Sequence, residues 1–110
     1  MPAELPEPIR AYLDGSNAHD AAACVACFAP DAVVMDEGRE RRGTADIRAW
    51  KEEVIGKYHA LVDVVGVAGD KAGRLIVTGR VTGNFPGSPV DLRYGFTLAD
   101  GKIARLEIVP

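Results

Sequence analysis

The sequence predicts an α+β domain in which three N-terminal helices pack against one face of a curved sheet of antiparallel strands. Two observations support this prediction. Helical spacings of apolar residues dominate the first half of the chain, and four β-rich runs separated by turn signals fill the second half. Helices followed by a run of strands are typical of α+β domains. Because 110 residues suffice for one core, we expect a single domain over residues 1–110.

The first predicted helix begins near Pro8, because proline is tolerated in the first turn of a helix. Its apolar residues follow the helical spacing i, i+3, i+4 and are Ile9, Tyr12 and Leu13. Residues 15–17, with the sequence Gly-Ser-Asn, are expected to interrupt this helix.

The second predicted helix covers residues 20–28 and is ended by Pro30. Cys24, Cys27 and Phe28 lie on one stripe of it. A Cys-x-x-Cys pair in the middle of a helix suits neither a stable disulfide nor a complete metal site. We therefore expect two buried, reduced and metal-free thiols that pack as small hydrophobic side chains.

A short β-rich run over residues 32–36 is the first predicted strand, and the charged residues 37–42 are expected to pair back onto it. This strand ends in a carboxylate, Asp36, with apolar residues upstream. Burial of a lone carboxyl group raises its pKa and makes it a usable proton acceptor, so Asp36 is a candidate general base. The alternative is that Asp36 only hydrogen-bonds the turn.

The third predicted helix begins at Thr44, a favourable N-cap residue, and Asp46 in its first turn complements the helix dipole. Gly56 is expected to loosen its end. The apolar face of this helix is formed by Ile47, Trp50 and Val54.

Four further strands are predicted over residues 60–68, 74–83, 89–99 and 102–109. Residues 90–98 alternate between apolar and polar side chains. We expect Leu92, Tyr94 and Phe96 to face the core, with Asp91 and Arg93 facing outward. Asp100-Gly101 predicts a tight turn between the last two strands.

Composition excludes several classes of function. A formal net charge of −3 argues against a nucleic-acid partner, and the basic residues of the 37–42 turn are interrupted by a glutamate, as in a solvated turn. No apolar run approaches the ~20 residues that a membrane span needs. The first ten residues lack the basic and apolar regions of a secretory signal, so we expect a cytoplasmic location.

Several short sequence features, taken in their order and spacing, resemble the nuclear transport factor 2-like superfamily, and most closely its ketosteroid isomerases and SnoaL-like polyketide cyclases. The resemblance covers nearly the whole chain. It implies a cone-shaped α+β barrel in which three helices close a strongly bent mixed sheet around a deep apolar pocket. The features that support it are Tyr12-Leu13, residues 17–20 (Asn-Ala-His-Asp), residues 28–34 (Phe-Ala-Pro-Asp-Ala-Val-Val), Arg42-Gly43, Ile47 and residues 100–103 (Asp-Gly-Lys-Ile).

The resemblance also implies roles for individual residues. Asp36 falls at the position of the isomerase general base, and Tyr12 at that of the phenol that hydrogen-bonds the developing enolate oxygen. Tyr94 takes the strand position of the protonated acid that completes the oxyanion hole. Phe28 and Lys51 stand where two tyrosines support the phenol, so the supporting network differs from that of the isomerases.

The candidate catalytic residues are therefore Asp36, Tyr12 and Tyr94. The candidate ligand-binding residues, with no metal ligand among them, are Phe28, Met35, Trp50 and Phe96. Two phenols and a carboxylate in an apolar cavity form an enolisation site, in which a base removes a proton next to a carbonyl and donors stabilise the resulting oxyanion. The alternative is that both tyrosines are core aromatics with satisfied hydroxyls and that Trp50 belongs to the core or the pocket wall without touching a ligand.

The functional hypothesis is a cofactor-independent isomerase or cyclase-type enzyme that acts on a small apolar carbonyl compound. The alternative is a non-catalytic ligand-binding or dimerisation module of the same fold, because fold alone does not decide function. A homodimer through the outer face of the sheet is also expected, because residues 61–67 are apolar on both faces of their strand.

Overall fold

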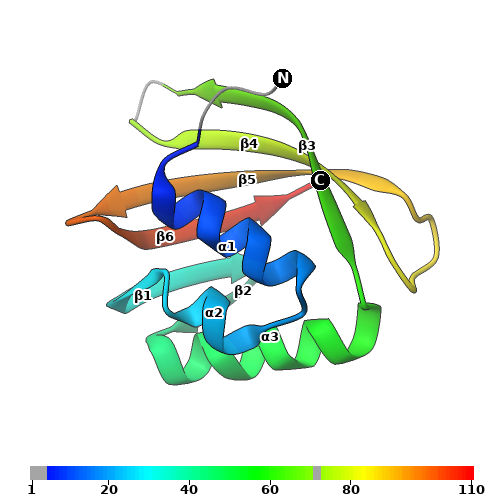
Figure 1. The fold of residues 1–110 in the computed structure, drawn as a ribbon, viewed down its shortest axis with the longest axis horizontal. Coiled ribbons are helices and arrows are strands. Elements are labelled where there is room, and N and C mark those ends of the chain that lie inside the picture. Colours follow the sequence, from blue (N-terminus) through cyan, green and yellow to red (C-terminus); the bar gives the residue numbers. More distant parts are fainter. Residues whose placement is uncertain (1–4, 71–72) are drawn as a thin grey trace.

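A six-stranded mixed sheet bends around a layer of helices in the computed structural model, which describes residues 5–70 and 73–110 (Figure 1). The strand order is β2-β1-β6-β5-β4-β3, with β1 and β6 parallel and the other neighbours antiparallel. The sheet does not close, which is consistent with a cone-shaped α+β fold and confirms the predicted class. The elements are α1 (Glu7–Asn17), α2 (Ala21–Val25), β1 (Phe28–Asp36), β2 (Arg39–Arg42), α3 (Thr44–Tyr58), β3 (Leu61–Gly69), β4 (Leu75–Thr82), β5 (Val90–Ala99) and β6 (Lys102–Val109).

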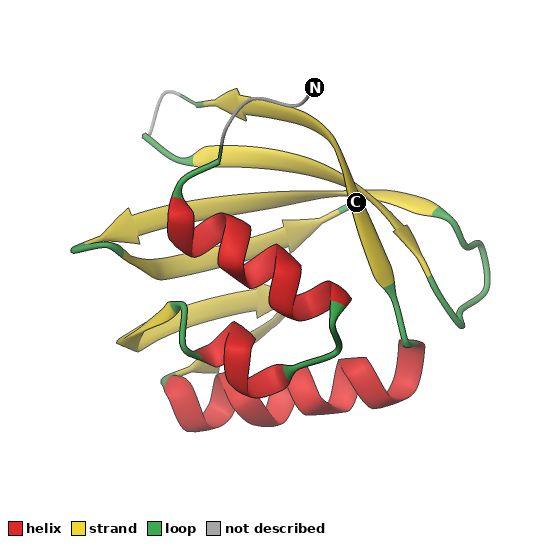
Figure 2. Cartoon of the chain, in the orientation of Figure 1, coloured by secondary structure: helices red, strands yellow, loops and turns green. Residues whose placement is uncertain are grey.

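The helices lie together on one side of the sheet (Figure 2). α1 contacts β3 and β6, α3 contacts β1 and β2, and α2 packs between the other two helices. Within the described ranges, no helix is long and apolar enough to cross a membrane.

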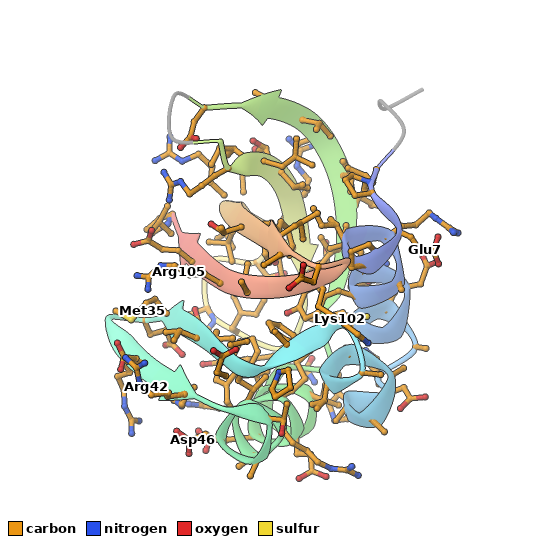
Figure 3. All side chains as sticks on the ribbon, turned by 90° about the vertical axis from the view of Figure 1, so that its left-hand side faces the viewer. Glu7, Met35, Arg42, Asp46, Lys102 and Arg105 are labelled. Carbon is orange, nitrogen blue, oxygen red and sulfur yellow. The ribbon has the colours of Figure 1, made fainter. Side chains whose placement is uncertain are left out.

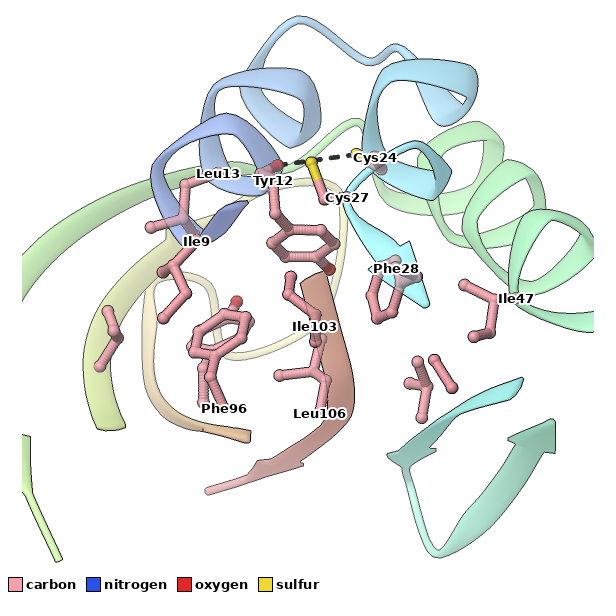
Figure 4. Close-up of a cluster of buried hydrophobic side chains, with 14 of the residues drawn as sticks. Ile9, Tyr12, Leu13, Cys24, Cys27, Phe28, Ile47, Phe96, Ile103 and Leu106 are labelled. Carbon is pink, nitrogen blue, oxygen red and sulfur yellow. Dashed lines mark hydrogen bonds between the residues drawn. The ribbon is translucent and has the colours of Figure 1, made fainter. Parts of the chain in front are cut away.

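The core fills the space between the helices and part of the concave face of the sheet (Figure 4). Tyr12 points from α1 into this cluster, where its ring meets Phe28 of β1 edge to face at a centroid distance of 5.6 Å. Burial of such large apolar side chains is the main force that holds the helices on the sheet. The largest fully buried side chains include Ile9, Tyr12, Ile47, Phe96, Ile103 and Leu106.

The first helix is longer than predicted, because it continues through residues 15–17 to Asn17. A Cβ atom on Gly15 would lie 3.2 Å from the Cβ of Ala23 and 3.2 Å from the backbone nitrogen of Cys24. The missing side chain of Gly15 therefore lets α2 pack closely against α1. The glycine serves a contact between helices and does not break α1.

The second helix is shorter than predicted and ends at Val25, so Phe28 opens β1 and Pro30 lies inside that strand. The backbone N–H of Ile103 donates to the carbonyl of Cys27 at 2.8 Å, and Phe28 pairs with Ile103 in the parallel register of β1 and β6. Because of this long-range pairing with β6, the chain is extended from Phe28 onward and does not continue the helix. The prediction of a helix up to residue 28 was wrong for that reason.

The start of the third helix also differs from the prediction. Its N-cap is Gly43, with φ of 84°, and the helix begins at Thr44. No side chain makes a capping hydrogen bond at this end of α3. The Asp46 side chain instead accepts a hydrogen bond from the backbone N–H of Arg42, the last residue of β2. The junction of β2 and α3 is therefore held by a carboxylate in the first turn of the helix.

The four predicted strands of the second half are confirmed. Each observed bound either equals the predicted bound or differs from it by one residue. Tyr94 and Phe96 are buried, Leu92 is half-buried, and Asp91 and Arg93 are exposed, as the alternation predicted. Asp100 and Gly101 both have positive φ, at 52° and 75°, which suits the tight turn between β5 and β6.

Both cysteine thiols are buried and not joined in a disulfide. The Cys24 thiol donates to the backbone carbonyl of Tyr12 at 3.6 Å (Figure 4). The Cys27 thiol donates to the backbone carbonyl of Ala23 at 3.4 Å. Burial raises the pKa of the Cys24 thiol to about 11 and also raises the pKa of Cys27. Both therefore pack as small protonated side chains, as predicted for core thiols.

Candidate functional site

A cavity of about 580 Å³ opens between α1, α3 and the concave face of the sheet. This volume lies in the range of small-molecule sites. Most of its wall is apolar and comes from α3 and from strands β3 to β6, and its polar side chains include Tyr12, Ser16, Asp36, Lys51 and Tyr94. The structure thus brings the three candidate catalytic residues to the wall of one cavity, from α1, β1 and β5.

Asp36 is the last residue of β1 and is half-buried in the cavity wall. The indole Nε1 of Trp50 donates a hydrogen bond to its Oδ2 at 3.0 Å. Burial raises the pKa of this carboxyl above its ordinary value, and the neighbouring charge of Glu37 acts in the same direction. The hydrogen bond from Trp50 and the charges of Lys51 and Arg41 oppose that rise in pKa. Burial prevails, which is the condition for a carboxylate that accepts protons readily.

Trp50 therefore does more than fill the core. Its side chain is 4% exposed, it lies in the cavity wall, and its N–H fixes one oxygen of Asp36. The second oxygen of Asp36 has no hydrogen-bond partner among the described residues. The indole thus holds the carboxylate in one orientation and leaves an oxygen free to act.

Tyr12 and Tyr94 are both buried, and burial raises the pKa of each phenol. The charge of Asp36 contributes to that rise for both phenols, so the three groups share one electrostatic environment. Tyr94 stacks on Phe96 with ring planes 12° apart and centroids 6.3 Å apart. Both phenols are protonated at neutral pH and can donate a hydrogen bond into the cavity.

Lys51 belongs to the site, although its side chain was not among the candidate site residues. It is 7% exposed and lines the cavity, and its Nζ donates to the Tyr12 hydroxyl at 3.1 Å and to Ser16 Oγ at 2.9 Å. Burial lowers the pKa of this amine. Because Lys51 donates to the Tyr12 oxygen, the Tyr12 hydroxyl proton must point away from Nζ.

A signal for Lys51 was present in the sequence. Ile47, Trp50 and Val54 define the inward face of α3, and position 51 falls on the same face at spacing i, i+4 from Ile47. In the same way, Ser16 follows Tyr12 by four residues on α1. A lysine on a stripe that is otherwise buried marks either a pairing or a chemical role.

Three predicted ligand-binding residues lie outside the cavity wall. Phe28 and Phe96 are fully in the core and support the ring of Tyr12, at centroid distances of 5.6 and 5.9 Å. Met35 lies on the opposite face of the sheet from the helices, near Arg105 in Figure 3. Side chains alternate along a strand, so the neighbours of an inward Asp36 must point outward.

Within residues 5–70 and 73–110, no cluster of three or more histidine, cysteine or carboxylate side chains is placed to hold a metal ion. The rings of the two histidines, His19 and His59, meet edge to face with their centroids 5.8 Å apart. His19 lines the cavity and its Nε2 lies 2.9 Å from the carbonyl oxygen of Ala60.

Comparison with known proteins gives a family and a fold. The sequence model of the SnoaL-like domain matches residues 9–106. No curated protein matches the chain. Among solved structures, a protein from Sinorhizobium meliloti that has been provisionally assigned as a polyketide cyclase is 39% identical, covers 96% of this chain and 95% of its own, and has a TM-score of 0.89.

Two further solved structures are similar to this chain. A protein from Pseudomonas putida with the same provisional assignment is 27% identical, over 96% of this chain and 90% of its own, with a TM-score of 0.75. A protein of ketosteroid isomerase-like fold from Catenulispora acidiphila is 16% identical. The match covers 97% of this chain and 87% of that protein, with a TM-score of 0.82. The latter likeness concerns the fold alone.

Proposed function

Because the chain belongs to the SnoaL-like domain family, we propose that it is a cofactor-independent enzyme of isomerase or cyclase type, with Asp36 as its general base. The base takes a proton from the carbon next to a carbonyl of a small, largely apolar ligand. The observation that supports this most directly is the position of Asp36, half-buried in the cavity wall and oriented by Trp50.

In this proposal, the free oxygen of the Asp36 carboxylate accepts the proton from carbon. The electron pair left behind moves onto the carbonyl oxygen, which becomes an enolate. The hydroxyls of Tyr12 and Tyr94 supply hydrogen bonds to that oxygen, because both are protonated and line the same cavity. Return of the proton to a different carbon gives isomerisation, and attack of the enolate on a second carbonyl gives ring closure.

The similarity to two proteins provisionally assigned as polyketide cyclases supports a carbonyl-rich ligand. Carbon between two carbonyl groups is acidic, so a carboxylate of raised pKa is a strong enough base to remove its proton. A 1,3-dicarbonyl compound is therefore the first class of substrate to test.

The test is deuterium uptake from heavy water at the carbon next to the carbonyl, followed by NMR for a panel of small ketones, enones and 1,3-diketones. Asp36→Asn keeps the size of the side chain and an acceptor for Trp50 but cannot act as a base. We expect it to lower the exchange rate by roughly 10²- to 10⁴-fold, the usual contribution of a general base.

Asp31→Asn is the matched control, since Asp31 is an exposed carboxylate on the same strand. It should exchange at the rate of the unaltered protein. If Asp36→Asn keeps its fold and its exchange rate, the catalytic role is wrong, and a non-catalytic binding module becomes the better reading. Fluorescence of Trp50, the single tryptophan of the chain, would then report ligand binding in the cavity.

We also propose that the chain forms a homodimer through the outer face of the sheet. Leu61 and Val65 of β3 are 53% and 50% exposed, and Leu61 lies on the opposite face from the inward Val62. Exposed large apolar side chains in one strand are typical of an association surface. Light scattering at micromolar concentration should give twice the chain mass, and a monomer mass would refute the dimer.

A further inference from the structure

Lys51 is a buried amine that makes no close ion pair, although the charge of Asp36 acts on it through the cavity. None of the ion pairs within residues 5–70 and 73–110 includes it. Its hydrogen bonds go to two neutral hydroxyls, those of Tyr12 and Ser16. Removal of an ammonium group from water is unfavourable, so burial lowers the pKa of Lys51 and makes its neutral form easier to reach than that of an exposed lysine.

Two hydrogen bonds occupy two of the three positions that Lys51 Nζ has besides its bond to carbon. An ammonium has three N–H groups, whereas a neutral amine has two N–H groups and a lone pair. In the described part of the chain, Lys51 Nζ has two hydrogen-bond acceptors, Tyr12 Oη at 3.1 Å and Ser16 Oγ at 2.9 Å. In the neutral amine these two bonds use both N–H groups and leave the lone pair in the third position, as attack on a carbonyl requires.

The surroundings of Nζ suit chemistry at a carbonyl carbon. Lys51 lines the cavity, and the rings of Tyr12 and Trp50 lie 4.8 and 5.2 Å from Nζ. Aromatic faces at these distances stabilise a cation, which includes a protonated imine. The indole N–H of Trp50 also donates a hydrogen bond to Asp36, so the amine of Lys51 and the carboxylate of Asp36 both contact the same ring.

We propose that Lys51 is a nucleophile that forms an imine with a ketone or aldehyde group of the ligand. The inference deepens the proposed function and rests on it for the class of ligand, a small carbonyl compound. Nucleophilic lysines of this kind are amines desolvated in an apolar pocket.

The step balances without an oxidant or reductant. The Nζ lone pair attacks the carbonyl carbon, and one proton moves from nitrogen to oxygen to give a carbinolamine. Loss of the new hydroxyl with a second nitrogen proton releases one water and leaves a carbon–nitrogen double bond. The hydroxyls of Tyr12 and Ser16 contact Nζ and can transfer these protons. Once protonated, the imine withdraws electrons from the adjacent carbon, so that Asp36 removes its proton to give an enamine, and water later restores the amine.

The experiment uses pentane-2,4-dione as the probe, because its imine rearranges to a conjugated enaminone with a near-ultraviolet absorption band. We expect this band in the unaltered protein, together with a mass gain of one diketone minus one water on the peptide that contains Lys51. Reduction with cyanoborohydride in the presence of a simple ketone should fix a secondary amine at the same residue.

Lys51→Arg keeps a cation that can donate to Tyr12 and Ser16 but does not form the imine, so we expect complete loss of the band and the adduct. Lys57→Arg is the matched control, because Lys57 lies exposed on the same helix, and it should behave like the unaltered protein. If arginine does not fit, Lys51→Met tests the same loss, with thermal unfolding as the check on folding. Adducts on the exposed Lys57 and Lys102 but not on Lys51 would overturn the proposal.

The two proposals fail in different ways. In Asp36→Asn we expect the enaminone to form while deuterium exchange is lost. If Lys51→Arg exchanges deuterium normally and no adduct forms in the unaltered protein, the imine is wrong and the general base stands. If Asp36→Asn exchanges normally while the adduct still maps to Lys51, the general base is wrong and the nucleophile stands.

Discussion

The concave face of the sheet is filled at one end and open at the other, although the same strands run through both ends. On β5, Phe96 is fully buried in the core, whereas Leu92, four residues earlier on the same face, lines the cavity. On β6, Leu106 is in the core and Ile108 borders the cavity. Tyr94 lies at the boundary, because it stacks on Phe96 and also reaches the cavity wall.

The difference comes from what the helices place opposite the strands. At the filled end, α1 and α2 present large or closely packed side chains, including Tyr12 and Cys24. At the open end, α1 presents the small Ser16 in its last turn and α3 presents Lys51. The filled end thus stabilises the fold with apolar contacts, whereas the open end contains titratable groups whose pKa values are shifted by burial. Such groups concentrate at functional sites.

The largest expected difference between the two ends concerns stability. Phe96→Ala removes a fully buried ring that contacts Tyr12 and Tyr94, and it should lower the free energy of unfolding by roughly 3–5 kcal/mol. Leu92→Ala removes a half-buried side chain next to space that is already open, so it should cost less than about 2 kcal/mol. Urea unfolding of both variants measures the difference, and equal losses would show that the open end is packed after all.

Sequence reasoning predicted the strands, and it predicted that several residues would reach the cavity, because the signals for both are local. Alternation along residues 90–98 fixed the register of Tyr94, and the apolar strand before Asp36 indicated that its carboxyl would be partly buried. The end of α2 could not be predicted in the same way, because the pairing of Phe28 with Ile103 spans most of the chain.

The site was predicted less completely than the fold. Asp36, Tyr12, Tyr94 and Trp50 do reach one cavity, but their roles stay predictions. Met35 was assigned to the ligand, although strand alternation next to an inward Asp36 excludes it. From the resemblance, Lys51 was noted only as standing where the isomerases have a supporting tyrosine. Its contacts with Tyr12 and Ser16 depend on how α1 and α3 pack. Packing of this kind cannot be read from spacing alone.

A smaller effect should distinguish the role of the Trp50 indole, which orients the carboxylate, from the role of Asp36 itself. The hydrogen bond from Trp50 lowers the pKa of Asp36, so Trp50→Phe should raise that pKa further. A general base acts in its ionised form, and the acid limb of the pH profile of deuterium exchange should therefore move to higher pH. Tyr58→Phe, on the same helix and in the cavity wall, is the control and should leave the limb in place. An unshifted limb in Trp50→Phe would mean that the indole only fills space.

The smallest expected effect is a gain in stability at the open end. Burial raises the pKa of Asp36 above its ordinary value of 3.8, so between 3.8 and the raised pKa the native state binds more protons than the unfolded state. The free energy of unfolding contributed by this group therefore falls as pH rises through that window, and the loss is complete above it. Asp36→Asn has no charge to bury, so it should match the unaltered protein below pH 3.8 and be more stable at pH 7, by at most about 1 kcal/mol because water reaches the half-buried carboxyl. Urea unfolding at several pH values measures this difference. If Asp36→Asn were less stable than the unaltered protein at pH 7, the ionised carboxylate would be a structural partner of Trp50, and the contrast between a filled end that stabilises and an open end that carries function would fail at its central residue.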